Sequence, residues 1–134
     1  MSAANEFQRL VYQRLIADDG VHALIGDRVY DQPPASVEYP YISFGASSTY
    51  LDDADCIPTR IVSLQIDVWS TYQGGNKEAN DAVDAMKAAL HDYEADLDNN
   101  ALALLQVRGM QVFRDADGLT THGFVRVEAI IEER

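Results

Sequence analysis

The sequence predicts an α+β fold in which two helices pack on one face of a mostly antiparallel sheet of four to five strands. Two segments space their apolar residues as amphipathic helices do, and others alternate apolar and polar residues as half-buried strands do. In chain order they read helix, two or three strands, helix, two strands, and covering one sheet face with both helices is the economical packing. With 134 residues, 47% of them hydrophobic, we expect residues 1–134 to form a single domain around one core.

The first helix is predicted over residues 4–17, where apolar side chains recur at helical spacing: Phe7, Leu10, Val11 and Leu15. Asp18-Asp19-Gly20 is expected to end it, since glycine accepts the left-handed conformation that commonly closes a helix. Residues 21–25 are expected to add one further turn, which Gly26 ends. The second helix is predicted to begin after Asn76, a good N-cap, and to run to about Tyr93. Its apolar residues fall on one arc: Ala79, Ala82, Val83, Met86, Leu90 and Tyr93.

The clearest predicted strand spans residues 60–70, where one face is apolar: Val62, Leu64, Ile66 and Val68. Further strands are predicted at residues 28–30, 41–46, 105–114 and 123–132. The polar segment 47–58 is expected to form a loop. Residues 115–118, with the sequence Asp-Ala-Asp-Gly, are expected to form the turn of a hairpin between the last two strands.

The charge of the chain excludes several classes of partner. Ten Lys and Arg residues against 22 Asp and Glu give a formal net charge of −12. Such a surface repels nucleic acid, because attraction to phosphate needs clustered Lys and Arg, and it argues equally against anionic membranes. No uncharged apolar run approaches the ~20 residues needed to span a bilayer, so we expect no membrane association.

Half of the negative excess lies in residues 78–98. This run has a net charge of −6, because Lys87 is its one basic residue and it holds seven acids: Glu78, Asp81, Asp84, Asp92, Glu94, Asp96 and Asp98. Such a run is typical of a solvated helix face that keeps a protein soluble.

Two acidic clusters lie outside that run, one at residues 115–117 and one at residues 52–55, and neither predicts a metal site. An EF-hand loop needs Gly at its sixth position and Glu at its twelfth, whereas counting from Asp115 the Gly is fourth and the twelfth residue is Arg126. A second cluster, Asp52, Asp53 and Asp55, lies in the predicted loop, which does not prearrange its carboxylates for a cation. A solvated or partner-facing loop is therefore favoured there.

Catalytic signatures are absent from the sequence. His22, His91 and His122 are scattered, and there is no Gly-x-Ser-x-Gly motif or glycine-rich phosphate loop. Cys56 is the only cysteine, so it makes no intrachain disulfide, and the acids beside it disfavour a thiolate. We expect no catalytic residue, no metal and no cofactor, and hence no enzyme.

Aromatic residues gather near the predicted central strand: Trp69 and Tyr72 at its end, and Tyr39, Tyr41 and Tyr50 in the neighbouring segment. Tyr and Trp are favoured at interfaces, because they bury much area at a small entropic cost. The alternative is that these side chains pack beneath the helices.

Five motifs then follow one another along the chain. They are Asp19-Gly20 after the first helix, DRVYD at 27–31 with Pro33, YPYISFG at 39–45, VWS at 68–70, and VFRD at 112–115 with Asp117-Gly118 and His122-Gly123. This ordered set covers nearly the whole chain. It resembles the small tail-completion, or tail-terminator, family of long-tailed phages, prophages and gene transfer agents.

The resemblance implies a structural virion protein at the head–tail junction, assembled in the cytoplasm of the bacterial host. Members of such a family form a ring, usually a hexamer, on the last ring of the tail tube. The ring ends tube polymerisation and offers a surface to the head-side connector, as the phage lambda tail terminator does. The implied partners are further copies of the chain, the major tail tube protein and the connector or stopper, while DNA passes through without specific binding.

A ring of this kind predicts two groups of site residues. The segment 47–58 is the expected arm between subunits, and the candidate interface residues are Tyr50, Asp52, Asp53, Asp55, Arg60, Arg28 and Trp69. An acidic channel would repel DNA phosphate. Its expected lining is either part of the acidic run, with Asp81, Asp84 and Asp92, or the 52–55 loop.

Two alternatives stay open at this point. One is a head-completion or stopper protein of the same junction, which binds the portal side instead of the tail tube. The other is a small soluble ligand-binding or enzymatic α+β domain, which requires a concave pocket with convergent polar groups.

Overall fold

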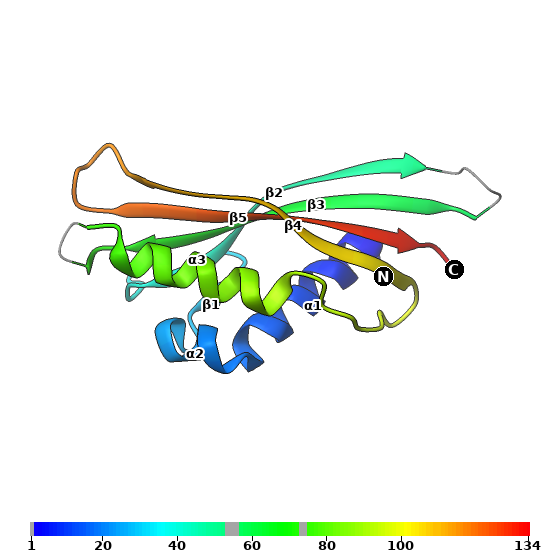
Figure 1. The fold of residues 1–134 in the computed structure, drawn as a ribbon, viewed down its shortest axis with the longest axis horizontal. Helices are drawn as coiled ribbons and strands as arrows, with labels where there is room; N and C mark the ends of the chain where they lie inside the picture. Colours follow the sequence, from blue (N-terminus) through cyan, green and yellow to red (C-terminus); the bar gives the residue numbers. More distant parts are fainter. Residues whose placement is uncertain (1, 53–56, 73–74) are drawn as a thin grey trace.

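The computed structural model, which describes residues 2–52, 57–72 and 75–134, has a layer of three helices against one face of a five-stranded sheet (Figure 1). The elements in chain order are α1 (Ala3–Ala17), α2 (Asp19–Ile25), β1 (Val29–Tyr30), β2 (Tyr41–Asp52), β3 (Thr59–Ser70), α3 (Lys77–Leu90), β4 (Ala101–Arg114) and β5 (Thr121–Glu132). The predicted α+β class is confirmed.

The strands lie in the order β1-β2-β3-β5-β4. The pairs β2–β3, β3–β5 and β5–β4 are antiparallel, whereas the short β1 runs parallel to the start of β2. The sheet is therefore mixed, with a single parallel pairing at one edge. Within the described ranges, no helix has the length and apolar character needed to cross a membrane.

The apolar side chains of the helices and the strands pack into one continuous core between the two layers. Phe7, Val11 and Leu15 of α1 are fully buried, as is the predicted apolar face of β3. Gly123 of β5 lets α3 approach the sheet. A Cβ atom at this position would lie 2.9 Å from a methyl group of Val68 and 3.0 Å from one of Val83.

The predicted extra turn at 21–25 is a full helix, and Asp18 rather than Gly20 separates it from α1. The Asp18 N–H donates to the carbonyl of Arg14, which closes α1, while its carboxylate accepts from the Val21 N–H and caps α2. Gly20 lies inside α2, so its predicted role at the end of the first helix is wrong. The left-handed glycine is Gly26, with φ +63°.

Helix α3 ends at Leu90 rather than at Tyr93, because the chain turns there to cover the edge of β4. The Asp92 N–H donates to the carbonyl of Leu105 at 2.9 Å, and the Val107 N–H donates to Nδ1 of His91 at 3.0 Å. Asp92 adopts a positive φ of 59° in this turn. At the other end, Asn76 holds the N-cap position, but its side chain makes no capping hydrogen bond.

Residues 47–52 are strand and not part of the predicted loop 47–58. Strand β2 continues to Asp52 and pairs with β3 as far as Thr59, after a register shift between Phe44 and Ser47. Small and polar residues such as Ser47 and Ser48 are compatible with this pairing because nothing buries them, and residues 45–52 are all exposed. Of the remainder of the predicted loop, the structure describes Ile57 and Pro58, which lie outside the strands.

The turn between β4 and β5 is where the sequence predicts it. Gly118 has φ +72°, and its N–H donates to the carbonyl of Asp115. The Asp117 carboxylate accepts hydrogen bonds from the N–H groups of Leu119 and Thr120 and from the Thr120 hydroxyl. These bonds, led by that of the Thr120 N–H, hold the pKa of Asp117 below its usual value. The carboxylate thus acts as a turn residue.

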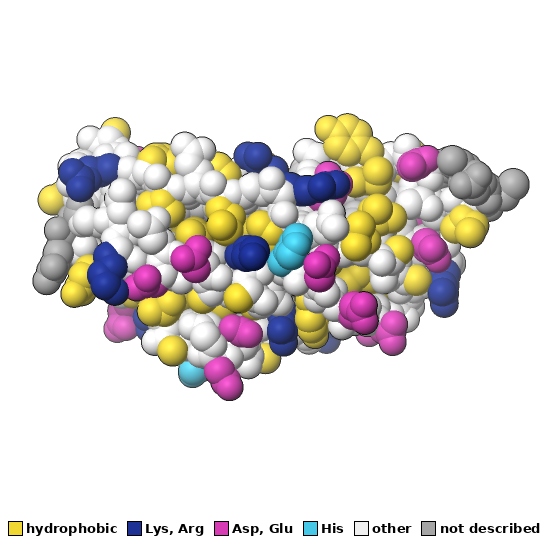
Figure 2. All heavy atoms as spheres, viewed as in Figure 1, with side chains coloured by type: hydrophobic (Ala, Val, Ile, Leu, Met, Phe, Trp, Pro, Cys, Tyr) yellow, Lys and Arg dark blue, Asp and Glu magenta, His cyan; other side chains and the backbone are white. Residues whose placement is uncertain are grey.

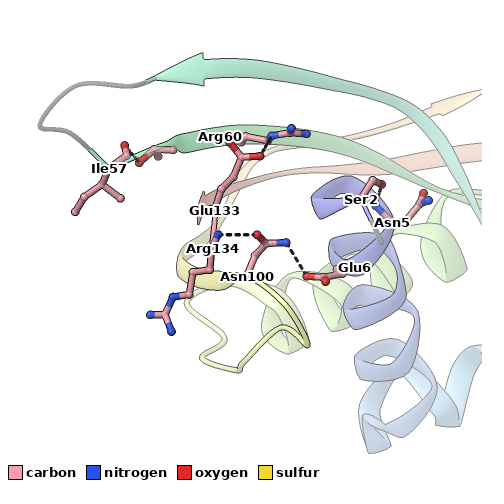
Figure 3. A network of polar contacts seen from close by, with 9 residues as sticks. Ser2, Asn5, Glu6, Ile57, Arg60, Asn100, Glu133 and Arg134 are labelled. Carbon is pink, nitrogen blue, oxygen red and sulfur yellow. Dashed lines mark hydrogen bonds and ion pairs between the residues drawn. The ribbon is translucent and has the colours of Figure 1, made fainter.

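One buried acid joins α1 to the segment before β4. Glu6 is 3% exposed, and its two oxygens accept from the Asn99 N–H and the Asn100 side-chain amide, each at 3.1 Å. Asn100 in turn accepts from the N–H of Arg134, so the network reaches the C-terminus (Figure 3). Burial raises the pKa of Glu6, but the hydrogen bonds from Asn100 and Asn99 together outweigh it, and the net pKa is lowered.

Candidate assembly surfaces

The far end of the β2–β3 hairpin projects beyond the helical layer (Figure 1). We call residues 47–52 and 57–61 the arm. It carries three exposed large hydrophobic side chains: Tyr50 at 65%, Leu51 at 70% and Ile57 at 49%. Exposed apolar side chains grouped at one extremity are typical of a contact surface rather than of a solvated loop.

The arm also carries charge. Nε of Arg60, which is in register with Leu51, lies 2.6 Å from Oε1 of Glu133 (Figure 3). The Glu133 N–H donates to the carbonyl of Pro58. Arg60 therefore engages an acid of its own chain. Asp52 ends β2 and is exposed. The predicted interface residues Asp53 and Asp55 lie outside the described residues.

A second surface is the sheet face that no helix covers. Four aromatic rings lie side by side across its four long strands, because Tyr41 is in register with Trp69, Trp69 with His122 and His122 with Phe113. We call these four residues the aromatic row. Ring centroids are 6.4 Å apart from Tyr41 to Trp69, 3.9 Å from Trp69 to His122 and 4.9 Å from His122 to Phe113.

Polar side chains beneath the rings fix the aromatic row. Asp67 is 6% exposed, and its Oδ1 lies 2.7 Å from Nε2 of His122 and accepts from the Gln65 amide at 2.9 Å. Trp69 donates its indole N–H to the Ser43 hydroxyl at 3.1 Å. Gly45 makes room for the carboxylate, because a Cβ atom there would lie 2.6 Å from Asp67 Oδ2.

Tyr39 and Arg28 make further contacts at the end of the row that lies on β2. Burial, followed by the neighbouring Tyr39, raises the pKa of Tyr41. Tyr39 itself is 42% exposed. Arg28, a predicted interface residue, donates from Nε to the carbonyl of Pro40 at 2.8 Å and so holds the start of β2. Trp69, another predicted interface residue, is half-buried within the row and does not lie beneath the helices.

The short motifs that run through the sequence meet at this row. Residues 39–45, 68–70 and 112–115, together with His122-Gly123, come from four strands that the sheet order places side by side. Sequence reasoning assigned no site role to His122, Phe113 or Asp67. The alternation of each strand was visible, but the register that puts His122 beside Trp69 was not.

The predicted channel acids separate into two places. Asp81 and Asp84 lie one turn apart on the exposed side of α3. Lys77 pairs with Asp81 at 2.8 Å, and this hydrogen bond and charge raise the pKa of Lys77. Asp92 lies beyond the helix, with a carboxylate oxygen 3.5 Å from Nε2 of His91. Figure 2 shows acidic side chains scattered over the helical layer rather than gathered in one patch.

Among the residues that the structure describes, no three His, Cys, Asp or Glu side chains are placed to hold a metal ion. The structure presents three surfaces: the apolar arm at one extremity, the aromatic row on the open sheet face, and the helical side, where the acidic side chains are scattered.

One family model matches most of this chain. The model of the family described as "Tail completion protein gp17" matches residues 9–132. A comparison with curated protein sequences finds no match.

Two solved structures share the fold. A chain of the virion of a native gene transfer agent particle superposes with a TM-score of 0.88 at 24% identity, over 98% of this chain and 99% of that one. The bacteriophage SPP1 gp17 protein superposes with a TM-score of 0.52 at 17% identity, over 95% of this chain and 89% of that one.

Proposed function

Because this chain belongs to the gp17 family of tail completion proteins, we propose that it forms a ring on the last ring of a tail tube, most simply a hexamer. Proteins of this family are structural components of the virion tail, so the chain is a tail completion protein and not an enzyme. In the proposed role the ring ends polymerisation of the major tail tube protein and presents its other side to the head-side connector.

The observation that carries the proposal is the arm. A closed ring needs heterologous contacts, in which one patch of a subunit meets a different patch of the next. The arm supplies a projecting patch with Tyr50 and Leu51 exposed, well away from the helical layer. Asp52 adds negative charge at the end of β2, so the partner surface is expected to be basic or neutral.

The charge of the chain suits a ring through which DNA passes. Six copies carry a formal charge of −72, which opposes adhesion of phosphate to the channel. We place the exposed side of α3, with Asp81 and Asp84, and the nearby Asp92 toward this channel. The alternative is that the 52–55 segment, instead of α3, lines the channel.

Tube capping tests this function directly. The purified protein is added to the polymerising tube protein of the same phage, and tube lengths are measured by negative-stain electron microscopy. We expect tubes that stop growing and carry a ring at one end. Unlimited growth in the presence of excess protein would contradict the proposal, and binding to the portal side without binding to tubes would identify a stopper instead.

A deletion of residues 50–56 provides the matched variant. Of these residues the structure describes 50–52, which end β2, are exposed and are not part of the core. The deleted chain is expected to stay folded by circular dichroism but to lose both ring formation and tube capping. Rings formed by the deletion variant would show that the arm is not the subunit contact.

A further inference from the structure

We propose that neighbouring subunits join through the edges of their sheets, with β2 of one copy added as an antiparallel strand beside β4 of the next. In this contact residues 48–51 lie opposite residues 110–113, with Leu51 opposite Met110. The occupant of each edge is thus a second copy of this chain. The inference rests on the proposed ring and specifies the backbone contact that would close it.

Both edges of the sheet are only partly covered inside one subunit. Strand β1 pairs with residues 42–43 of β2 and goes no further. At the other edge, the turn after α3 hydrogen-bonds to Leu105 and Val107 of β4. In the part of the chain that the structure describes, no strand pairs with the outer side of residues 47–51 or of residues 109–113. These two segments are therefore open to a further strand.

The outer edge of β2 presents backbone hydrogen-bonding groups at Thr49 and Leu51. Ile42 points its N–H away from β3, since it donates to the carbonyl of Arg28. The β3 partners of Ile42, Thr49 and Leu51 are separated by even numbers of residues: Val68, Val62 and Arg60. Because backbone groups alternate between the two edges of a strand, Thr49 and Leu51 point outward as Ile42 does.

The outer edge of β4 presents the same groups at Met110 and Val112. Val107 marks this edge, because its N–H donates to Nδ1 of His91 outside the sheet. The β5 partners of Val107, Met110 and Val112 are alternate residues of that strand: Val127, Val125 and Gly123. Met110 and Val112 therefore also direct their N–H and C=O groups outward.

The two edges fit each other in direction and in face. Three successive antiparallel pairings, from β2 through β3 and β5 to β4, make β2 and β4 run in opposite directions. Across the sheet, Leu51 is level with the buried Ile131, and Met110 is paired with the buried Val125, so both side chains lie on the helical side. Pairing Leu51 with Met110 therefore keeps the helical layers of both copies on the same side of one continuous sheet.

The side chains along the two edges are also complementary. Leu51 is 70% exposed and Met110 is 44% exposed, and the contact sets these two apolar side chains opposite each other. Neither residues 47–51 nor residues 109–113 include a charged residue or a proline, which commonly protect an exposed strand edge. Both segments thus have the composition of paired strands rather than of solvated edges.

The contact joins unlike edges and so leads from one copy to the next. Leu51 is level with Arg60 of β3 and Met110 with Ile66, so the two segments lie six residues, or about 20 Å, apart along the strands. Contacts between unlike patches generate a ring where the rotation closes, and strand tilt accommodates such a displacement in a closed sheet. A two-fold pairing of two β2 edges would instead leave Met110 exposed in both copies.

A disulfide between the two edges tests the contact. Tyr50→Cys and Gln111→Cys are combined in a Cys56→Ser background and oxidised, and the products are separated on a non-reducing gel. Both positions are exposed, and in the proposed pairing they form a non-hydrogen-bonded pair with Cα atoms about 4.5 Å apart, which suits a disulfide. Inside one subunit they lie on opposite strands of the sheet edge and about 20 Å apart along the strands, so only neighbouring copies can link.

We expect a ladder of covalent species that ends at the full ring. Ser48→Cys with Gln111→Cys is the matched control, and it should link far less, because its two positions share a face but are offset by two residues. Rings that form without the Tyr50–Gln111 disulfide would overturn the inference while leaving the proposed ring intact. A disulfide-linked dimer of Tyr50→Cys alone, without rings, would identify paired β2 edges and overturn both. A chain that forms no ring in solution or on tail tubes would also overturn both.

Thr49→Pro provides a second measurement that leaves the exposed apolar side chains unchanged. It removes the outward N–H of Thr49 but keeps the pairing of β2 with β3, because proline is accepted on a strand edge where the N–H faces solvent. We expect it to raise the concentration needed for half-assembly by about tenfold. The control Thr49→Ala, which keeps the N–H, should stay within about threefold of wild type. Circular dichroism checks that both variants fold, and equal assembly by the two folded variants would contradict the backbone pairing.

Discussion

Nε2 of His122 lies 2.7 Å from Oδ1 of Asp67, and the same imidazole stacks on Trp69 with ring centroids 3.9 Å apart. One side chain of β5 is thus held to β3 both by a hydrogen bond to a buried carboxylate and by a ring contact. This pair of contacts fixes the aromatic row on the open face of the sheet.

Replacing Asp67 by Ala should destabilise the fold. The change leaves the His122 and Gln65 donors without their acceptor on a nearly buried site, and we expect a loss of about 1–3 kcal/mol in the free energy of unfolding. Urea unfolding followed by circular dichroism measures it. Ser63→Ala, on the same face of β3 but half-exposed, is the control. A stability equal to wild type would mean that the carboxylate does not hold the row.

Gly123→Ala should also destabilise, through the opposite face of the sheet. The added Cβ would meet methyl groups of Val68 and Val83 at 2.9 and 3.0 Å, so α3 must move outward, at a cost of about 1–3 kcal/mol. Thermal unfolding compares it with Gly109→Ala, where no heavy atom lies within 4 Å of the new Cβ. Equal melting temperatures for the two variants would rule out close packing of α3 at Gly123.

Glu6→Gln tests the tie between α1 and the segment before β4. The pKa of Glu6 is lowered in the folded chain, so its contribution to stability is present above the unfolded-state pKa and is lost as the pH falls through the folded-state pKa. The variant should therefore be less stable than wild type at neutral pH, and the difference should shrink in acid. Denaturant titrations from pH 7 down to pH 3 measure it. If the stability difference between wild type and Glu6→Gln grows toward acid pH, the prediction is contradicted.

Neutralising Asp81, Asp84 and Asp92 to Asn should leave the fold nearly unchanged and alter only the channel. The three side chains are exposed, and surface changes of this kind usually stay within about 0.5 kcal/mol each. We expect rings of the triple variant to retain DNA more strongly at low salt in a filter-binding assay. Unchanged retention would remove α3 from the channel and leave the 52–55 segment as its lining.

The period of the apolar residues was enough to predict the faces of β3 and β5 and the buried stripe of α1. It failed where contacts distant in sequence decide the structure. Residues 47–49 are small and polar, so the continuation of the strand beyond residue 46 was hidden until the pairing with β3 was known. Helix α3 ends early because His91 and Asp92 bind the edge of β4, a contact across more than ten residues.

Of the candidate surfaces, too, only a part could be predicted from the sequence. Tyr50 and Trp69 could be chosen from residue type and position alone. The aromatic row could not, because it depends on the registers that align Tyr41, Trp69, His122 and Phe113 across four strands. A sequence names the residues of each strand but not the neighbour that each residue meets.

The mass of the protein in solution, measured by multi-angle light scattering over a range of concentrations, tests the central claim most directly. A ring predicts a species near six times the chain mass of 14.9 kDa, with a central hole in negative-stain images and a return to monomers on deletion of residues 50–56. A closed two-fold dimer would contradict the account, as would a monomer at every concentration that also forms no ring on tail tubes.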